Sequence, residues 1–214
     1  MTAKNNYNRR KNIKYPKPSE LLAEFIGIFL GDGSFGSRYQ VAMSWNHRCE
    51  EPYARHIQKM VHKLFGLDSR IRVRKKYGSA EVIIDSSNMV DYLKKLIGIK
   101  AGGKKKSFKL PAWLSRNKRY KIGFLRGLFD SEGCIYKHRY YSNAKAYSYA
   151  KIAVTNYCDR ILSVFQHFLK SVKIDSVKYR NRIHIYSNAD TKRFFALVGS
   201  NNSKNIIRFK ELSH

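Results

Sequence analysis

The sequence repeats itself at an offset of 100 residues, and this constrains the fold more than any other feature. Leu21–Gly33 and Tyr120–Gly133 are apolar segments of helical length, and each ends in an acidic residue followed by glycine. The matched positions are Gly27 with Gly127, Asp32 with Glu132, and Gly33 with Gly133. Such self-similarity predicts one structural unit used twice.

Each copy continues with the same order of predicted elements, read from period-2 alternation for strands and amphipathic periodicity for helices. In the first copy we expect strands Ser34–Ser37 and Tyr39–Trp45, helix Glu51–Phe65, strands Arg70–Lys76 and Ala80–Asp85, and helix Ser87–Ile97. In the second we expect strands Cys134–Tyr140 and Tyr149–Thr155, helix Cys158–Val172, strands Asp175–Tyr179 and Arg182–Tyr186, and helix Asn188–Val198. The prediction is an α+β fold of two pseudo-symmetric αββαββα units with antiparallel sheets.

The domain boundaries follow from this repeat. We expect a basic tail at 1–18, a first half at 19–98, a basic linker at 99–117 and a second half at 118–214. The stretch from Ile99 to Lys121 holds nine basic residues and no acidic one, with a short helix expected at Pro111–Leu114.

The charge of the chain indicates the class of partner. The 214 residues include 43 Lys and Arg against 15 Asp and Glu, a net charge of +28, which predicts a polyanionic partner, nucleic acid ahead of an acidic membrane surface. A hydrophobic content of 43% argues against disorder. No apolar run is long enough to span a membrane, and the three cysteines lack the spacing of a zinc site or disulfide framework. We therefore expect a folded, intracellular, nucleic-acid-associated protein.

Small residues recur one helical turn apart in both apolar segments: Gly27 and Gly31, then Gly127 and Ser131. Residues four apart share a helix face, so these faces allow two backbones to approach closely. We expect the two repeated helices to pack on each other there. Packing within each half is the simpler alternative.

The acidic residues Asp32 and Glu132 end these helices, where the macrodipole and the unpaired carbonyls are already negative. If the helices lie side by side, the two carboxylates converge and a cation between them relieves the repulsion. Oxygen ligands suit Mg²⁺, and one shared ion or two could hold a phosphodiester. An Asp-Gly helix stop is the ordinary alternative, but two copies on so basic a chain favour the metal.

Phe25–Gly33 and Leu125–Gly133 resemble the two signature motifs of the LAGLIDADG homing endonucleases, in the single-chain form, and the resemblance spans roughly residues 19–214. It implies that Asp32 and Glu132 are catalytic metal-binding acids, and that the backbones of Gly31 and Ser131 help to hold two or three Mg²⁺ ions, replaceable by Mn²⁺. It also implies a monomer that takes part in intron homing. The implied reaction is hydrolysis of both DNA strands across the minor groove, leaving short 3′ overhangs.

The family pattern also suggests further catalytic residues. A polar residue usually ends the second strand of each half, which matches Asn156 and falls on Trp45 or Asn46 in the first half. Trp45 would depart from the pattern. A lysine after the last helix matches Lys100, and Lys204 in the second half matches less closely; a plain phosphate or solvent contact is equally open for both.

The alternation of Arg70, Arg72 and Arg74 with Ile71 and Val73 predicts a sheet with a core face and a DNA face. A solvated outer face is the alternative. By the same alternation, the outward residues of the first half are Arg38, Gln40, Ser44, Arg70, Arg72, Arg74, Lys76, Glu81 and Ile83. Those of the second half are Tyr136, His138, Tyr140, Lys151, Thr155, Ser176, Lys178, Arg180, Arg182 and His184.

Together the two sheets form a predicted DNA-binding saddle. One major-groove turn of about 10 bp per half gives a site of roughly 20 bp, only weakly palindromic because the two faces differ. Two other functions on the same fold remain open: an RNA maturase that binds intron RNA, and a DNA-binding protein that does not cleave. The presence of both acids favours cleavage.

Overall fold

The computed structural model describes residues 10–99, 108–142 and 145–212, apart from the side chains of 142 and 145–147. The first half comprises α1 (Glu20–Asp32), β1 (Gly33–Ser37), β2 (Gln40–Asn46), α2 (Glu51–Phe65), β3 (Arg70–Arg74), the 3₁₀ turn η1 (Lys75–Tyr77), β4 (Ser79–Asp85) and α3 (Ser87–Ile97). The short helix α4 (Ala112–Arg116) precedes the second half. That half comprises α5 (Lys118–Glu132), β5 (Gly133–Ser142), β6 (Lys145–Thr155), α6 (Asp159–Ser171), β7 (Val177–Tyr179), β8 (Arg182–Ile185), α7 (Asn188–Leu197) and α8 (Ser203–Leu212).

Each half builds one four-stranded antiparallel sheet, in the orders β1-β2-β4-β3 and β5-β6-β8-β7. The two orders correspond strand for strand, which confirms the predicted α+β fold of two repeated units. Alternate residues such as Val41, Val82, Ile152 and Ile183 are buried in the core. The opposite face of each sheet carries the polar and aromatic side chains discussed below.

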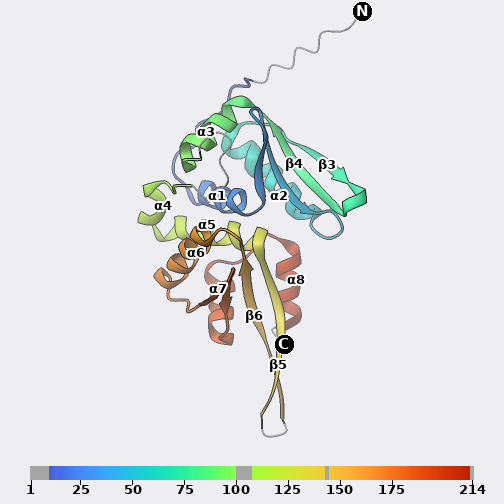
Figure 1. The fold of residues 1–214 in the computed structure, drawn as a ribbon, viewed down its shortest axis with the longest axis vertical. Helices are drawn as coiled ribbons and strands as arrows, with labels where there is room; N and C mark the ends of the chain where they lie inside the picture. The colour runs from blue at the N-terminus through green and yellow to red at the C-terminus, as the bar shows by residue number, and fades with distance from the viewer. Residues whose placement is uncertain (1–9, 100–107, 143–144, 213–214) are drawn as a thin grey trace, which may run out of the picture.

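The helices α1 and α5 lie side by side between the two halves (Figure 1). A Cβ on Gly27 would lie 2.8 Å from the backbone nitrogen of Leu128, and one on Gly127 would lie 2.9 Å from the carbonyl carbon of Glu24. Real Cβ atoms do not come that close to backbone, so only glycine permits this approach. The expectation that the repeated helices pack through their small residues is confirmed.

The structure corrects several expected boundaries. Helix α8 was not predicted, and it packs against β5 and β6 as an addition to the αββαββα pattern of the second half. The β5–β6 hairpin is longer than expected and projects from the second half (Figure 1), with only the base of β6, Ile152–Thr155, paired to β8. In the first half, β3 ends at Arg74 because the chain turns through η1 and Gly78, whose φ is +60°.

Residues 10–18 follow the helical side of the first half. The Lys14 N–H donates to the Phe65 carbonyl at 2.9 Å, the Asn88 amide donates to the Lys11 carbonyl at 3.0 Å, and the ring of Tyr15 packs edge-on against Tyr92. This part of the expected tail therefore lies against α2 and α3. None of the helices in the described ranges is long and apolar enough to cross a membrane.

Candidate active site and nucleic-acid interface

The two motif helices end together. A Cβ on Gly31 would lie 2.8 Å from the Cβ of Ser131 and 3.0 Å from the Cγ of Glu132, so the last turns of α1 and α5 touch at these residues. Each helix runs straight into a strand, because the Gly33 N–H still donates to Phe29 and the Gly133 N–H to Phe129. The structure thus brings Gly31, Ser131 and Glu132 of the predicted metal-binding set into contact, and Asp32 follows Gly31 as the last residue of α1.

Asn156 contacts Glu132 directly. Its Nδ2 donates to Glu132 Oε1 at 2.7 Å, while its Oδ1 accepts from the Cys158 backbone N–H at 2.8 Å. Its backbone N–H also donates to the Asn181 carbonyl at 3.0 Å. Asn156 is therefore held at both ends, and it orients one carboxylate oxygen of Glu132.

The first half differs at the corresponding position. Gly33 pairs with Met43 as Gly133 pairs with Val154, so Trp45 stands where Asn156 stands in the second half. Trp45 is buried, and its indole N–H has no hydrogen-bond partner. Asn46 matches one contact of Asn156: its Oδ1 accepts from the N–H two residues on, that of Arg48, at 3.0 Å. The two halves thus support their acids differently.

Of the two candidate lysines, Lys100 lies outside the described residues. Lys204 lies in the first turn of α8 rather than in a loop, and its ammonium pairs with Glu50 Oε1 at 2.6 Å. It also lines a pocket with Cys49 and Cys134, one cysteine from each half. Its observed partner is thus Glu50 of the first half.

The outer face of the first sheet carries arginines held by carboxylates. Ser44, Glu81 and Arg72 face one another across β2, β4 and β3. Glu81 accepts from Arg72 at 2.5 Å and from Arg74 at 3.0 Å, and Asp85 accepts from Arg70 at 3.0 Å and from Gln40 at 2.8 Å. The arginine side chains remain 41–54% exposed, so the ion pairs orient guanidinium groups that still face solvent.

Three outward residues of the first half are placed differently from the prediction. Ile83 was expected to reach DNA, but it is fully buried beneath its neighbours on the outer face, where it pairs with Ala42 and Arg70. Arg38 lies in the turn between β1 and β2, and Lys76 lies in η1. Both are exposed, but neither belongs to a strand face.

The outer face of the second sheet is aromatic. Tyr136 pairs with Lys151, and His138 with Tyr149, which places these side chains on one face as predicted. The rings of His184 and Tyr186 stack at 5.1 Å and an angle of 4°. Further members of this face are Tyr140, Thr155 and Arg182.

Lys151 was expected to face DNA, but it is 7% exposed. Its ammonium lies 5.2 Å from the ring centre of Tyr149 and 4.6 Å from that of Tyr186, so two tyrosines cover it through cation–π contacts. The lysine supports the aromatic face from below instead of contacting a partner.

The alternation predicted for β7 is wrong by one residue. Val177 pairs with His184 and Tyr179 with Arg182, so Val177 and Tyr179 occupy the outer face, 51% and 59% exposed. A one-residue shift moves every side chain to the other face. Lys178 therefore lies on the helical side, where it pairs with Asp159 of α6. Ser176 precedes the strand, and Arg180 lies in the β7–β8 turn at a φ of +50°, over the Tyr179 ring.

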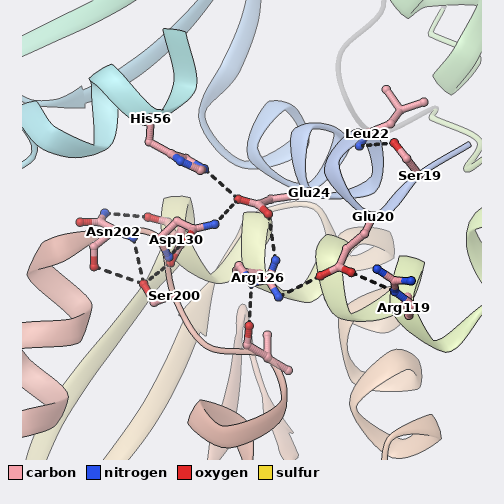
Figure 2. Close-up of polar contacts among 12 residues, drawn as sticks. Ser19, Glu20, Leu22, Glu24, His56, Arg119, Arg126, Asp130, Ser200 and Asn202 are labelled. Carbon is pink, nitrogen blue, oxygen red and sulfur yellow. Dashed lines mark hydrogen bonds and ion pairs between the residues drawn. The ribbon is translucent and has the colours of Figure 1, made fainter. Parts of the chain in front are cut away.

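A buried polar cluster that was not predicted from the sequence joins the paired helices (Figure 2). Glu24 of α1 is 2% exposed and accepts from His56 at 3.1 Å, Arg126 at 3.0 Å and Asn201 at 2.6 Å. Burial by itself would raise the pKa of Glu24, but these donors and the charge of Arg126 hold it below the usual value. The sequence did contain a sign of this cluster, because charged residues interrupt both apolar motif segments: Glu24 in the first, and Arg126 and Asp130 in the second.

Asp130 of α5 is also buried, at 1% exposure, and burial is the main cause that raises its pKa to about 7. It accepts from the Ser200 hydroxyl, and from the Asn201 N–H at 2.7 Å. The segment after α7 thus contacts both motif helices.

The donor set at the helix ends fits a hard divalent cation. It consists of the Asp32 and Glu132 carboxylates beside the carbonyl ends of two helices, and oxygen is the ligand that Mg²⁺ prefers. Within the described ranges no group of three or more His, Cys, Asp or Glu is arranged to hold a metal. The remaining ligands would have to be backbone, water or phosphate oxygens.

The LAGLIDADG-like domain profile matches residues 19–97 and 119–212, one match per half. No curated protein matches the chain. Among solved structures, full-length DUF199/WhiA from Thermatoga maritima has a TM-score of 0.58 and 17% identity, covering 94% of this chain and 62% of that one. This chain thus spans about three fifths of that protein.

Two other similar structures contain DNA. I-DmoI in complex with DNA and Mn has a TM-score of 0.57 and 16% identity, covering 84% of this chain and 96% of that one. The meganuclease I-AabMI bound to uncleaved DNA has a TM-score of 0.60 and 13% identity, covering 92% and 88%. At such identities the likeness establishes the fold. With the profile matching both halves and both motif helices meeting at their acidic ends, this chain belongs to the LAGLIDADG-like domain family.

Proposed function

We propose that the protein is a site-specific, Mg²⁺-dependent DNA endonuclease. It cuts both strands of a weakly palindromic site of roughly 20 bp, about one helical turn per half, and leaves short 3′ overhangs. The observation that carries this proposal is the contact of Gly31 with Ser131 and Glu132, which brings two acid-bearing helix ends together. The similar structures I-DmoI and I-AabMI, both solved with DNA, support the choice of partner.

Asp32 and Glu132 would hold the cations, with help from the backbones of Gly31 and Ser131. When bound, divalent cations supply the positive charge that stabilises the attacking and leaving oxygens of a phosphodiester. The protein brings the two carboxylates together, and Asn156 fixes the orientation of Glu132 through its 2.7 Å hydrogen bond. We propose that one chain acts as a monomer, because its two halves already provide both acids.

DNA binding follows from charge and from the two outer sheet faces. The net charge of +28 supplies attraction to phosphates, and Arg70, Arg72 and Arg74 present donors suited to guanine edges. The aromatic face of the second sheet offers apolar contacts instead. We therefore expect the two half-sites to differ in sequence. We further propose an intracellular, DNA-associated enzyme of intron homing.

A second candidate function is binding of intron RNA as a maturase. The observation that favours it is the same aromatic face, since tyrosine and histidine rings stack on unpaired bases. Exposed rings there include Tyr140, Tyr179 and Tyr186, at 41%, 59% and 40%.

A cleavage selection on a randomised duplex pool tests the proposal. Three reactions run in parallel: the intact protein with Mg²⁺, the intact protein with Ca²⁺, and Asp32→Asn with Mg²⁺. One family of sites of about 20 bp, cut only in the first reaction, supports the endonuclease. A pool that is bound but never cut refutes it and leaves a non-cleaving binding protein or a maturase.

A further inference from the structure

The segment Ser200–Asn202, here termed the clasp, joins the catalytic end of α5 to the first half (Figure 2). On the α5 side it holds both the side chain and the backbone of Asp130. The Ser200 hydroxyl and the Asn201 N–H donate to the Asp130 carboxylate, the latter at 2.7 Å. The Asn202 amide donates to the Asp130 carbonyl at 3.0 Å. This carbonyl belongs to the last helical turn, whose carbonyls have no partner within the helix.

On the other side, the clasp reaches two elements of the first half. The Asn201 amide donates to Glu24 of α1 at 2.6 Å. The Asn202 amide donates to Glu50, which precedes α2, at 2.8 Å. Asn202 is fully buried and Glu50 is 7% exposed, so these bonds are shielded from water. In such surroundings the loss of one partner leaves a costly unsatisfied group, which makes the arrangement rigid.

A second bridge fixes the same helices a turn earlier. Arg126 of α5 donates to Glu24 at 3.0 Å, to Glu20 at 3.0 Å and to the Val198 carbonyl just before the clasp at 2.7 Å. Its side chain is 19% exposed. Val198, just before the clasp, is therefore held by Arg126, which also links α5 to α1.

The contacts are specific to the second motif. At the offset of 100, Asp130 corresponds to Leu30 and Arg126 to Ile26, both apolar. Close packing without charges can hold two helices together, as it does at Gly27 and Gly127. Buried charges carry a desolvation penalty that apolar residues avoid, so the buried carboxylates of Glu24 and Asp130 call for a role beyond stability.

We propose that the clasp positions Glu132 relative to Asp32, and that it thereby couples the cuts on the two DNA strands. Asp130, two residues before Glu132, is the link, and Ser200 and Asn202 are positioning residues that do not touch the substrate. This inference rests on the proposed endonuclease function. Release of the clasp lets the last turn of α5 shift, while Asp32 keeps its place on α1. One strand is then cut at a near-normal rate and the other slowly.

Ser200→Ala and Ser200→Thr form a matched pair, because only the first loses the hydroxyl that Asp130 accepts. Phe165→Leu, in the core of the second half and outside the clasp, controls for a loss of stability. Each variant is assayed on a supercoiled plasmid that carries the selected target, at a temperature where all are folded. The rates of the first and second cuts are measured separately, together with the Mn²⁺ affinity of the free protein by electron paramagnetic resonance.

We expect Ser200→Ala to slow the second cut about tenfold relative to the first, since a misplacement of ~1 Å costs up to about a hundredfold. Ser200→Thr and Phe165→Leu should keep the wild-type ratio. An unchanged ratio in Ser200→Ala, or an equal change in Phe165→Leu, overturns the inference.

If the wild-type protein cuts no DNA, the endonuclease proposal fails, and the Mn²⁺ titration alone decides about the clasp. If Ser200→Ala is the one variant that binds Mn²⁺ more weakly than the wild type, the clasp positions Glu132. Equal Mn²⁺ affinity in all four proteins rules it out.

Discussion

Gly127→Ala perturbs the contact on which the proposed active site depends. The added methyl would lie 2.9 Å from the carbonyl carbon of Glu24 and 3.0 Å from the backbone nitrogen of Ile28, both on α1. The Glu24 carbonyl oxygen would lie closer still. Normal contact begins at about 3.5 Å, so α1 and α5 must separate by about 1 Å or more. Alanine favours a helix by about 1 kcal/mol over glycine, while overpacking costs about 1–3 kcal/mol. We therefore expect the free energy of unfolding to fall by up to about 2 kcal/mol.

Cleavage should suffer more than stability, because the same separation moves Asp32 away from Glu132. A shift of ~1 Å at reacting groups costs up to about a hundredfold in rate. Urea unfolding followed by circular dichroism gives the stability, and single-turnover cleavage of the selected target gives the rate.

Ser163→Ala, at an exposed position of α6, is the control that changes helix propensity without an interhelical clash. It should leave the cleavage rate unchanged. If Gly127→Ala is as stable as the wild type and cuts at the same rate, the close packing of the motif helices has no functional consequence and our reasoning is wrong.

Three further predictions concern single residues. Asn156→Ala should lower the cleavage rate by about 10–100-fold with DNA affinity retained, because Glu132 loses its orienting donor; gel shifts and cleavage kinetics check both. Arg72→Ala should weaken binding to the selected site by about 1–3 kcal/mol and to random DNA by less, whereas Lys178→Ala on the helical side should not; equal losses at both sites would assign Arg72 to phosphate contacts. Burial raises the pKa of Asp130 to about 7, so the folded state holds this proton more tightly than the unfolded state does. The stability that results is present at low pH and is lost as the pH rises through about 7. The free energy of unfolding should fall by up to ~1.4 kcal/mol per unit between pH 5 and 7, and Asp130→Asn should flatten that slope.

The repeat made most of the fold predictable. Helices Glu51–Phe65 and Ser87–Ile97 occupy the predicted ranges, because strong amphipathic periodicity is a local property of the sequence. Alternation did not predict the faces of β7, because this strand has three residues and its register is set by pairing with β8. In so short a segment, alternation does not decide which side chains face the core.

The two acids of the candidate site and Asn156 were predicted from the sequence, whereas the clasp was not. Asp32 and Glu132 are visible because they recur at a fixed offset, whereas the sequence of the clasp does not recur: Lys100, Ala101 and Gly102 stand at the offset of 100. Comparison of the halves therefore gave no sign of α8, although Asn202 accepts from the Lys204 N–H as a helix cap. Likewise, Ile83 and Lys151 occupy the outer faces as alternation requires, but their neighbours bury them, and burial by neighbours is a tertiary property.

We propose that two acids, one from each motif helix, cleave DNA together. Asp32→Asn and Glu132→Gln decide this, with binding and strand cleavage measured on the same labelled duplex in Mg²⁺. We expect each variant to bind the site with near wild-type affinity and to fail to make the double-strand break. If either variant cut both strands at the wild-type rate, the two carboxylates would not be the catalytic pair.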